Sequence, residues 1–282
     1  MEQIYDKRFS LNRGISLKKD TIKVVFINWG IVMASFTILA IGLMLIEEFL
    51  IEAHILPISY SWLLVLLRYV LAVYLLWIFN QKIVQVKLNF KFKLNKVSLP
   101  PYLIAVIYVV YNLTGAQIKL KTNDQITTFL FCLGPGIFEE IWFRGIIFKK
   151  LRKISHNNKL VMPILLSSFL FAAVHLLVPD YLDIGALTIQ AVTAFVNGIL
   201  FAVVYLVSNN LVLPIAMHFS ANVLSFFGAG NPFLPKEISD WLFYQLNNWQ
   251  YALLEVVVKL SLALLIWGLY YFEKRRKKEL TY

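Results

Sequence analysis

Charged residues are scarce in this sequence, since Asp, Glu, Lys and Arg make up only 15% of its 282 residues. Soluble domains average about 25% charged residues. The hydrophobic fraction of 59% and the mean hydropathy of +0.69 are typical of a protein embedded in a membrane. This composition argues against a soluble enzyme or a soluble binding domain.

Cysteine is also nearly absent. The single residue, Cys132, excludes an intramolecular disulfide and a cysteine-rich metal site. The first 23 residues are polar and basic, with no short apolar core followed by a small-residue cleavage site, so we expect no cleaved signal peptide. The sequence has no internal repeat and no linker that would indicate a second domain.

Long apolar runs dominate the rest of the chain. Eight of them approach the ~20 residues that a ~30 Å hydrocarbon core requires. They predict an all-α, polytopic membrane protein with about eight transmembrane helices in one bundle. This transmembrane domain covers residues 24–272, between a basic N-terminus (1–23) and a basic tail (273–282). The runs are 24–46, 62–79, 99–113, 126–148, 160–178, 186–207, 211–227 and 251–272.

Lys and Arg are concentrated in alternate connections. They cluster in the N-terminus, in the second and fourth connections and in the C-terminal tail, whereas the other loops are richer in Asp and Glu. By the positive-inside rule, this pattern predicts a multi-pass protein of the cell membrane with both termini in the cytoplasm. The formal net charge of +11 then reflects topology and attraction to anionic lipid. We therefore expect membrane lipid as a partner, and no nucleic acid.

The fourth apolar run contains charges, in the sequence G-P-G-I-F-E-E-I-W-F-R-G. Each charge inside a bilayer costs roughly 2.5–3.5 kcal/mol on insertion scales, so such residues are candidates for a functional site. In a helix, Glu140 and Arg144 lie one turn apart on the same face and are expected to pair. Glu139 points about 100° away from Glu140. We interpret Glu139 as the carboxylate left free for chemistry.

Two histidines lie in later apolar runs. His175 lies in the fifth run, and His218 lies in the seventh, four residues before Asn222 on the same helical face. At a rise of 1.5 Å per residue, Glu139, His175 and His218 all fall near the middle of the membrane. If their helices are neighbours, the three side chains belong to one site.

These side chains support two kinds of hydrolysis. A carboxylate and an imidazole can deprotonate a water for attack on a carbonyl. A second imidazole with a carboxamide beside it can donate hydrogen bonds to the oxyanion. Glu139, His175, His218 and Asn222 supply these parts. Alternatively, Glu139, His175 and His218 form an N,N,O set of the kind that holds a catalytic zinc ion, although the sequence lacks a His-Glu-x-x-His motif.

Three short motifs on three apolar helices resemble, in order and in residue type, those of the CPBP family, also called the Abi family. They are Glu139-Glu140-x-x-x-Arg144, Phe171-x-x-x-His175 and His218-x-x-x-Asn222. The family groups type II CAAX prenyl endopeptidases with bacteriocin-processing and self-immunity enzymes. The resemblance covers about residues 126–227. It implies an eight-helix intramembrane protease whose site lies inside the bundle, opens to the cytoplasm and is oriented by Glu140 and Arg144.

The resemblance also implies a role for each remaining site residue. Glu139 and His175 would activate the water, and His218 with Asn222 would stabilise the oxyanion. Members are usually labelled metalloproteases, which would make Zn²⁺ the cofactor, held by Glu139, His175 and His218. A metal-free, glutamate-dependent mechanism is also argued for the family, so both alternatives stay open.

The expected substrate is a membrane-associated or prenylated protein or peptide, with a link to bacteriocin immunity or peptide processing. Two other functions compete with proteolysis. A transporter would be expected to show repeated halves, which this sequence lacks. A scaffold that regulates a sensor kinase or a cell-envelope enzyme would survive the loss of Glu139, whereas a protease would not.

Overall fold

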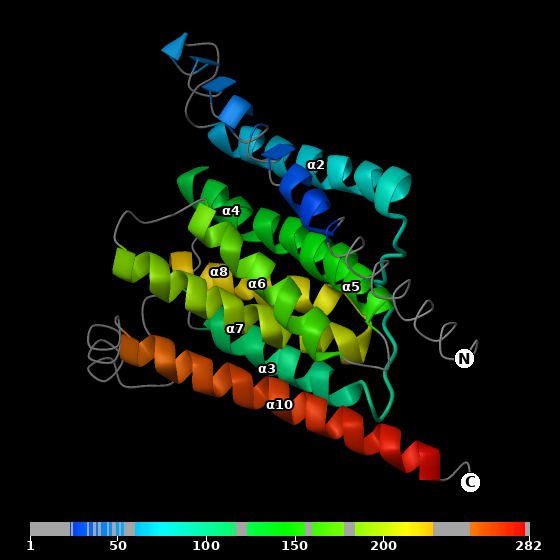
Figure 1. Ribbon diagram of the computed structural model, residues 1–282. Helices are drawn as coiled ribbons and strands as arrows, with labels where there is room; N and C mark the ends of the chain where they lie inside the picture. The colour runs from blue at the N-terminus through cyan, green and yellow to red at the C-terminus, as the bar shows by residue number, and fades with distance from the viewer. Residues whose placement is uncertain are drawn as a thin grey trace, which may run out of the picture.

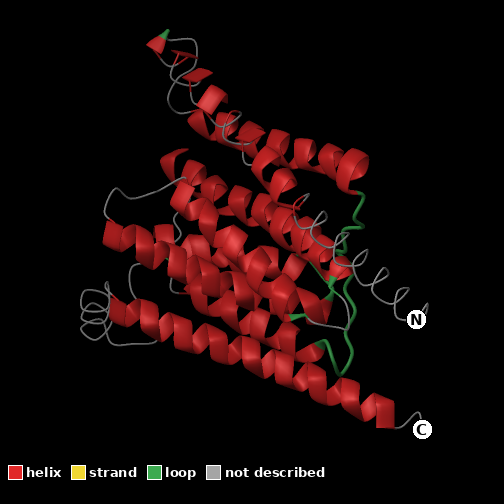
Figure 2. Cartoon of the chain, in the orientation of Figure 1, coloured by secondary structure: helices red, strands yellow, loops and turns green. Residues whose placement is uncertain are grey.

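The computed structural model describes residues 60–114, 116, 123–155, 160–177, 184–227 and 249–279, together with scattered positions between residues 23 and 53. Within these residues, every element with defined bounds is a helix (Figure 2), which confirms the all-α class. The elements are α2 (Ser61–Phe79), the π-helix η2 (Asn80–Val84), α3 (Leu99–Thr114), α4 (Asn123–Glu140), the π-helix η3 (Ile141–Phe148), α5 (Lys149–Ile154), α6 (Val161–Leu177), α7 (Ile184–Ser208), α8 (Val212–Phe227) and α10 (Trp249–Glu279).

Several of these helices have the length and composition of membrane spans. Four of the described helices are long enough to cross a bilayer, and three shorter apolar helices, α3, α6 and α8, have 16 or 17 residues. The chain is therefore a multi-pass membrane protein. Eight spans remain a prediction, because much of the first predicted run (24–46) lies outside the described residues. The four helices long enough to cross a bilayer are Trp62–Val84, Gln125–Lys153, Leu187–Ser208 and Ala252–Arg276.

The helices form one bundle with α2 and α10 on opposite sides (Figure 1). Helix α4 packs between α2 and α8, and α7 packs against both α6 and α10. Helix α8 also contacts α3 and α7. The neighbours of α4 and η3 therefore include α8, α6 and α7, so the three helices that carry the sequence motifs lie together, as the shared site requires.

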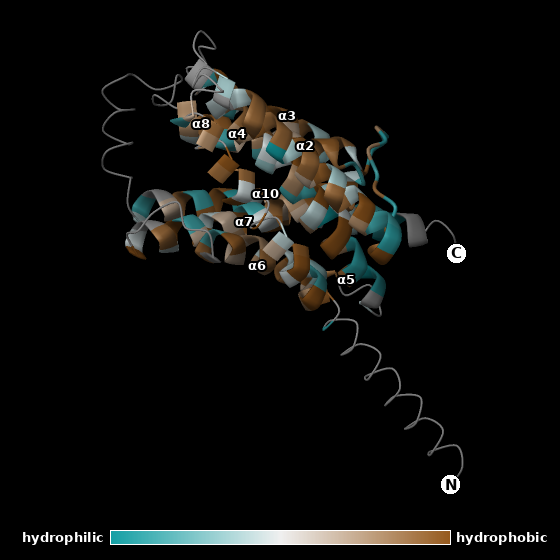
Figure 3. Cartoon of the chain, turned by 90° about the horizontal axis from the view of Figure 1, so that it is seen from above, coloured by the Kyte–Doolittle hydropathy of each residue, from teal (hydrophilic) through white to brown (hydrophobic). Residues whose placement is uncertain are grey.

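The outer helices expose apolar side chains over most of their length. Trp77 on α2 is 50% exposed and Leu264 on α10 is 69% exposed, and many neighbours on the same helices are similar. Figure 3 shows apolar residues along the helices and a hydrophilic end around α5. A soluble monomer rarely exposes so large an apolar surface. These faces fit contact with lipid.

The fourth apolar run is not one continuous α-helix. An α-helix was predicted over residues 126–148, but α4 ends at Glu140 and η3 continues the chain as a π-helix. Pro135 lies inside α4 and lacks the N–H of an ordinary helical residue. π-Helical turns are rare in proteins, and those that occur are frequently found at functional sites. The change of helix type falls immediately after the two adjacent carboxylates.

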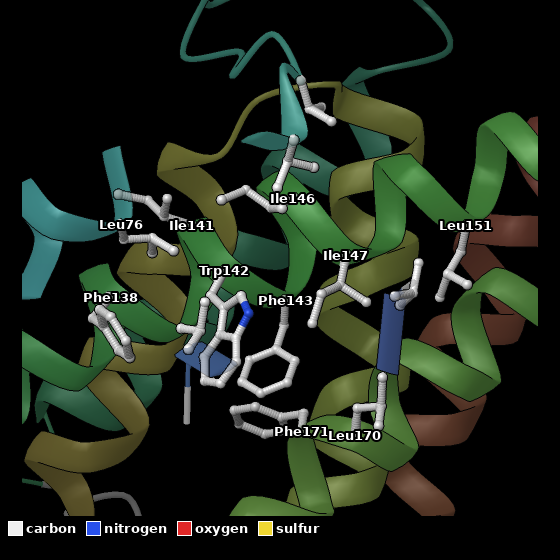
Figure 4. Close-up of a cluster of buried hydrophobic side chains, with 14 of the residues drawn as sticks. Leu76, Phe138, Ile141, Trp142, Phe143, Ile146, Ile147, Leu151, Leu170 and Phe171 are labelled. Atoms are coloured by element: carbon white, nitrogen blue, oxygen red, sulfur yellow. The ribbon is translucent and has the colours of Figure 1, made fainter. Parts of the chain in front are cut away.

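Aromatic side chains pack η3 against α6. The ring centroids of Trp142 and Phe143 lie 4.8 Å apart, and Phe143 meets Phe171 of α6 edge-on at 5.3 Å. Figure 4 shows these three rings at the centre of a cluster that also includes Leu76 of α2 and Leu170 of α6. All eight residues of η3 are buried. The π-helix is therefore held on several sides by close packing.

Gly198 sets the distance between α6 and α7. A Cβ atom at this position would lie 2.8 Å from the Cβ and 2.9 Å from the Cα of Ser168. Because one of these atoms is backbone, a rotamer change cannot relieve the clash. Small residues permit such close helix approach in membranes.

We predict that Gly198→Ala lowers the free energy of unfolding by about 1–3 kcal/mol through overpacking. The matched control is Gly268→Ala in α10, where a Cβ would meet nothing within 4 Å. That change should leave stability unchanged or raise it by up to ~1 kcal/mol, since alanine favours a helix over glycine. Thermal unfolding of the purified protein in detergent measures both, and equal midpoints for the two variants would contradict the prediction.

Candidate active site

A buried ion pair lies where α4 meets η3. Arg144 Nη1 donates to Glu140 Oε1 over 2.6 Å, and both side chains are almost completely excluded from the surface. This confirms the predicted pairing of Glu140 with Arg144. Arg144 Nη2 also donates to the carbonyl oxygen of Gly198 in α7, at 3.3 Å. The guanidinium therefore links the motif helix to the tightly packed point between α6 and α7.

His218 of α8 completes this group. Its Nδ1 lies 3.0 Å from Glu140 Oε1, the same oxygen that accepts from Arg144. A carboxylate paired with a guanidinium only accepts hydrogen bonds, so Nδ1 of His218 carries a proton and donates it. Nε2 is then the ring atom left for another partner. The sequence predicted a role for His218 beside Asn222 but gave no sign that Glu140 orients its ring.

Two phenylalanines enclose the charged groups. The guanidinium carbon of Arg144 lies 4.4 Å from the ring centroid of Phe171 and 5.5 Å from that of Phe201. The same two rings lie 5.5 Å and 5.9 Å from the ring of His218. Cation–π contacts of this kind strengthen when the cation is desolvated. The rings keep Arg144 and His218 in fixed positions and exclude lipid and water from them.

His175 lies near the end of α6 and is partly buried. Its Nδ1 is 3.2 Å from the carbonyl oxygen of Phe171, and its ring meets the Phe171 ring edge-on at 5.2 Å. Since a carbonyl accepts, Nδ1 donates, which again leaves Nε2 as the outward atom. Phe171 therefore contacts His175, His218 and Arg144 at once and connects all three motifs.

Glu139 takes no part in the hydrogen-bonded pair. Its Oε2 is buried and has no hydrogen-bond partner among the described residues, and the same is true of Glu140 Oε2. Glu139 nevertheless lies within electrostatic range of Arg144. Buried acceptors without partners are uncommon in folded proteins. Two such oxygens on adjacent residues mark a place where a water or a substrate group is needed.

Asn222 ties α8 to α4. Its Nδ2 donates to the carbonyl oxygen of Cys132 at 3.2 Å, and His218 contacts Glu140 further along the same pair of helices. A Cβ on Gly136 would come within 3.2 Å of the backbone nitrogen of Phe219, so the two backbones are close between these points. The helices are therefore antiparallel neighbours, and His218 and Asn222 face α4 together, as their spacing predicted.

The predicted zinc ligands Glu139, His175 and His218 can be compared with the side-chain positions in the structure. No group of three His, Cys, Asp or Glu side chains in this part of the chain has the spacing of a metal site. His218 donates from Nδ1 to Glu140 and keeps Nε2 for another ligand, as metal-bound histidines do, whereas the neighbouring cation of Arg144 would repel a metal ion. A zinc ion held by Glu139, His175 and His218 therefore stays a prediction.

Comparison with known proteins now adds a family. Residues 122–224 match the model of a family described as type II CAAX prenyl endopeptidase Rce1-like. Over this segment, which is less than half of its length, the chain is similar to the CAAX protease (CPBP) family. The matched segment begins just before α4 and ends within α8, so it contains every candidate site residue and leaves out α2, α3 and α10. No curated protein and no solved structure matches the chain. The similarity supports a membrane-embedded endopeptidase of the CAAX type.

Sequence reasoning missed two parts of this site, Gly198 and Phe201 of α7. Neither is polar, and their run contains no motif. The one available signal was a glycine inside a long apolar helix, which often marks close helix packing. Their roles depend on which helix lies against η3, and sequence spacing alone does not state that.

We predict that Arg144→Met destabilises the protein by about 3–5 kcal/mol, because Glu140 would remain as an uncompensated buried charge. The double variant Glu140→Gln/Arg144→Met should recover part of this loss. The control is the surface pair of Glu273 and Arg276, which are 3.0 Å apart and where Arg276→Met should cost less than about 1 kcal/mol. Denaturant unfolding in mixed micelles provides the comparison. Additive effects of the two buried substitutions would show that the pair is not coupled.

Proposed function

We propose that the protein is an intramembrane endopeptidase in which Glu139 activates a water for attack on a peptide carbonyl. One observation carries this proposal: Glu139 is next in sequence to the carboxylate that pairs with Arg144, is itself outside that pair, and has a buried oxygen without a hydrogen-bond partner among the described residues. A carboxylate so placed is available to take a proton.

The remaining roles follow from the same contacts. His175, with Nδ1 on a backbone carbonyl, would help to hold the water through Nε2. Glu139 takes a proton from the water while the water oxygen bonds to the carbonyl carbon. Glu139 then gives this proton to the nitrogen of the leaving amine. Asn222 has a second Nδ2 hydrogen besides the one on Cys132, and with His218 it would donate to the oxyanion. Glu140 and Arg144 act as positioning residues that hold His218.

The substrate that we propose is a membrane-associated protein or peptide, whether prenylated or not. The site residues lie on helices of the bundle, and the outer faces of that bundle are apolar. A substrate segment held at the membrane could therefore reach the site without a long excursion from lipid. A role in bacteriocin processing or immunity is one biological setting for such cleavage. We also propose that both termini of the chain lie in the cytoplasm.

The test of this function is Glu139→Gln, which keeps the size of the side chain and removes its basicity. We expect the rate of peptide cleavage to fall by about 10²–10⁴-fold, the range for loss of a general base. The control is Glu255→Gln in α10, which changes another carboxylate of the bundle that pairs with Lys259 at 3.1 Å. It should retain cleavage.

Cleavage of membrane-associated peptides by both purified variants, reconstituted in lipid, measures the difference. Full biological function of Glu139→Gln would instead support the alternative of a membrane scaffold that regulates a sensor kinase or a cell-envelope enzyme.

A metal-free mechanism gives a second prediction. If Glu139 activates the water without a metal, cleavage continues unchanged after prolonged dialysis against a strong chelator. Elemental analysis of the dialysed protein should be made in parallel, so that the metal content is known when the rate is measured. Loss of cleavage on dialysis, followed by recovery on addition of zinc, would show that a metal takes part.

A further inference from the structure

The connection between η2 and α3, residues 85–98, forms a strap along one end of the bundle (Figures 1 and 2). It contains no Asp or Glu, and lysines alternate with apolar residues along it. Its lysines are Lys87, Lys91, Lys93 and Lys96, all exposed. Its exposed apolar side chains are Phe90 (47%), Phe92 (67%) and Leu94 (56%).

The inner edge of the strap is fixed to the protein. Val86 exchanges two hydrogen bonds with the side chain of Asn80, at 2.8 Å and 3.1 Å. Lys149 Nζ donates to the carbonyl oxygen of Lys87 at 2.6 Å, and the N–H of Leu211 donates to that of Asn89 at 2.8 Å. These contacts reach the starts of α5 and α8, so the strap has a defined course.

The middle of the strap is held as well. The hydroxyl of Tyr102 accepts from the N–H of Lys93 at 3.4 Å and from Asn210 Nδ2 at 3.0 Å, and the ring of Phe92 lies 4.6 Å from that of Tyr102. The outward lysines are consequently presented as an ordered row. Little additional ordering is required when they bind a partner, which lowers the entropic cost of binding.

The strap lies at a membrane face, because it joins the span Trp62–Val84 to the apolar helix α3. Figure 1 shows α5 and the C-terminal end of α10 at the same end of the bundle. Those segments add basic residues, among them Lys150, Arg152 and Lys274. This end of the molecule is therefore strongly positive, and the strap exposes aromatic rings among its lysines, while Tyr271 and Phe272 are exposed at the end of α10.

We propose that the strap is a docking surface for the headgroups of anionic phospholipids. Ammonium groups near a membrane attract the phosphates of anionic lipids, and aromatic rings at the same level enter the interface between headgroups and acyl chains. An acidic protein segment would satisfy the lysines but would give no reason for the exposed Phe92 and Leu94. This surface lies outside the segment 122–224 and does not depend on proteolysis.

The test is a titration of the full-length protein in neutral detergent with fluorescent phosphatidylglycerol, using phosphatidylcholine as the competitor. The triple variant Lys91→Gln/Lys93→Gln/Lys96→Gln should bind phosphatidylglycerol about 100-fold more weakly, since each lysine near the surface contributes about a fivefold factor. Leu94→Ser, which keeps every charge, should also weaken binding. Thermal unfolding of each variant checks that the fold is retained.

The matched control removes the same number of charges from the same end of the molecule. This control is the triple variant Lys274→Gln/Arg275→Gln/Arg276→Gln, at the exposed end of α10. Its affinity for phosphatidylglycerol should stay within about threefold of the original, because general attraction to the charged end contributes little to binding at the strap. Equal losses of phosphatidylglycerol affinity in the two triple variants would overturn the proposal. Unchanged phosphatidylglycerol affinity of the strap variant would overturn it as well. Displacement of the lipid by an acidic peptide, with Leu94→Ser unaffected, would assign the strap to a protein partner instead.

Discussion

The structure depends on one buried electrostatic group. Glu140 accepts from Arg144 and lies 3.0 Å from His218 through the same oxygen, in a part of the bundle with no exposed surface. A charge in hydrocarbon is costly, and a buried ion pair is tolerable only where further hydrogen bonds satisfy both partners. Gly198 supplies one such bond to Arg144. The group therefore fixes α4, η3, α7 and α8 relative to one another.

This arrangement separates two adjacent carboxylates by role. Glu140 holds Arg144 and His218 through Oε1, whereas Glu139 takes no part in that group; each residue also has a buried Oε2 without a hydrogen-bond partner among the described residues. The change from α-helix to π-helix immediately after Glu140 alters the direction of every side chain that follows. It also packs Phe143 against Phe171, whose ring touches both His218 and Arg144. Aromatic packing and the ion pair thus support each other across three helices.

The sequence predicted the parts of this site that depend on local spacing. The i,i+4 rule gave the Glu140–Arg144 pair and the common face of His218 and Asn222, and apolar runs located most of the described helices within a few residues. The contact of His218 with Glu140 depends on which helices are neighbours, and spacing within one helix carries no such information. The π-helix was missed because its residues are as apolar as those of an α-helix.

The matched family segment carries the candidate site residues, and the chain before it supplies contacts that hold this segment in place. All candidate site residues lie between α4 and α8, yet the starts of α5 and α8 are tied to the strap, which precedes that segment. Lys149 makes one of these ties at the start of α5, which directly follows η3 and its Arg144. Leu211 makes the other just before α8, which carries His218. The ends of both segments are therefore set at the membrane face by backbone carbonyls of the strap. The motif residues fix α4 and η3 relative to α8 inside the bundle, and these ties to the strap add a second fixed point at the membrane face.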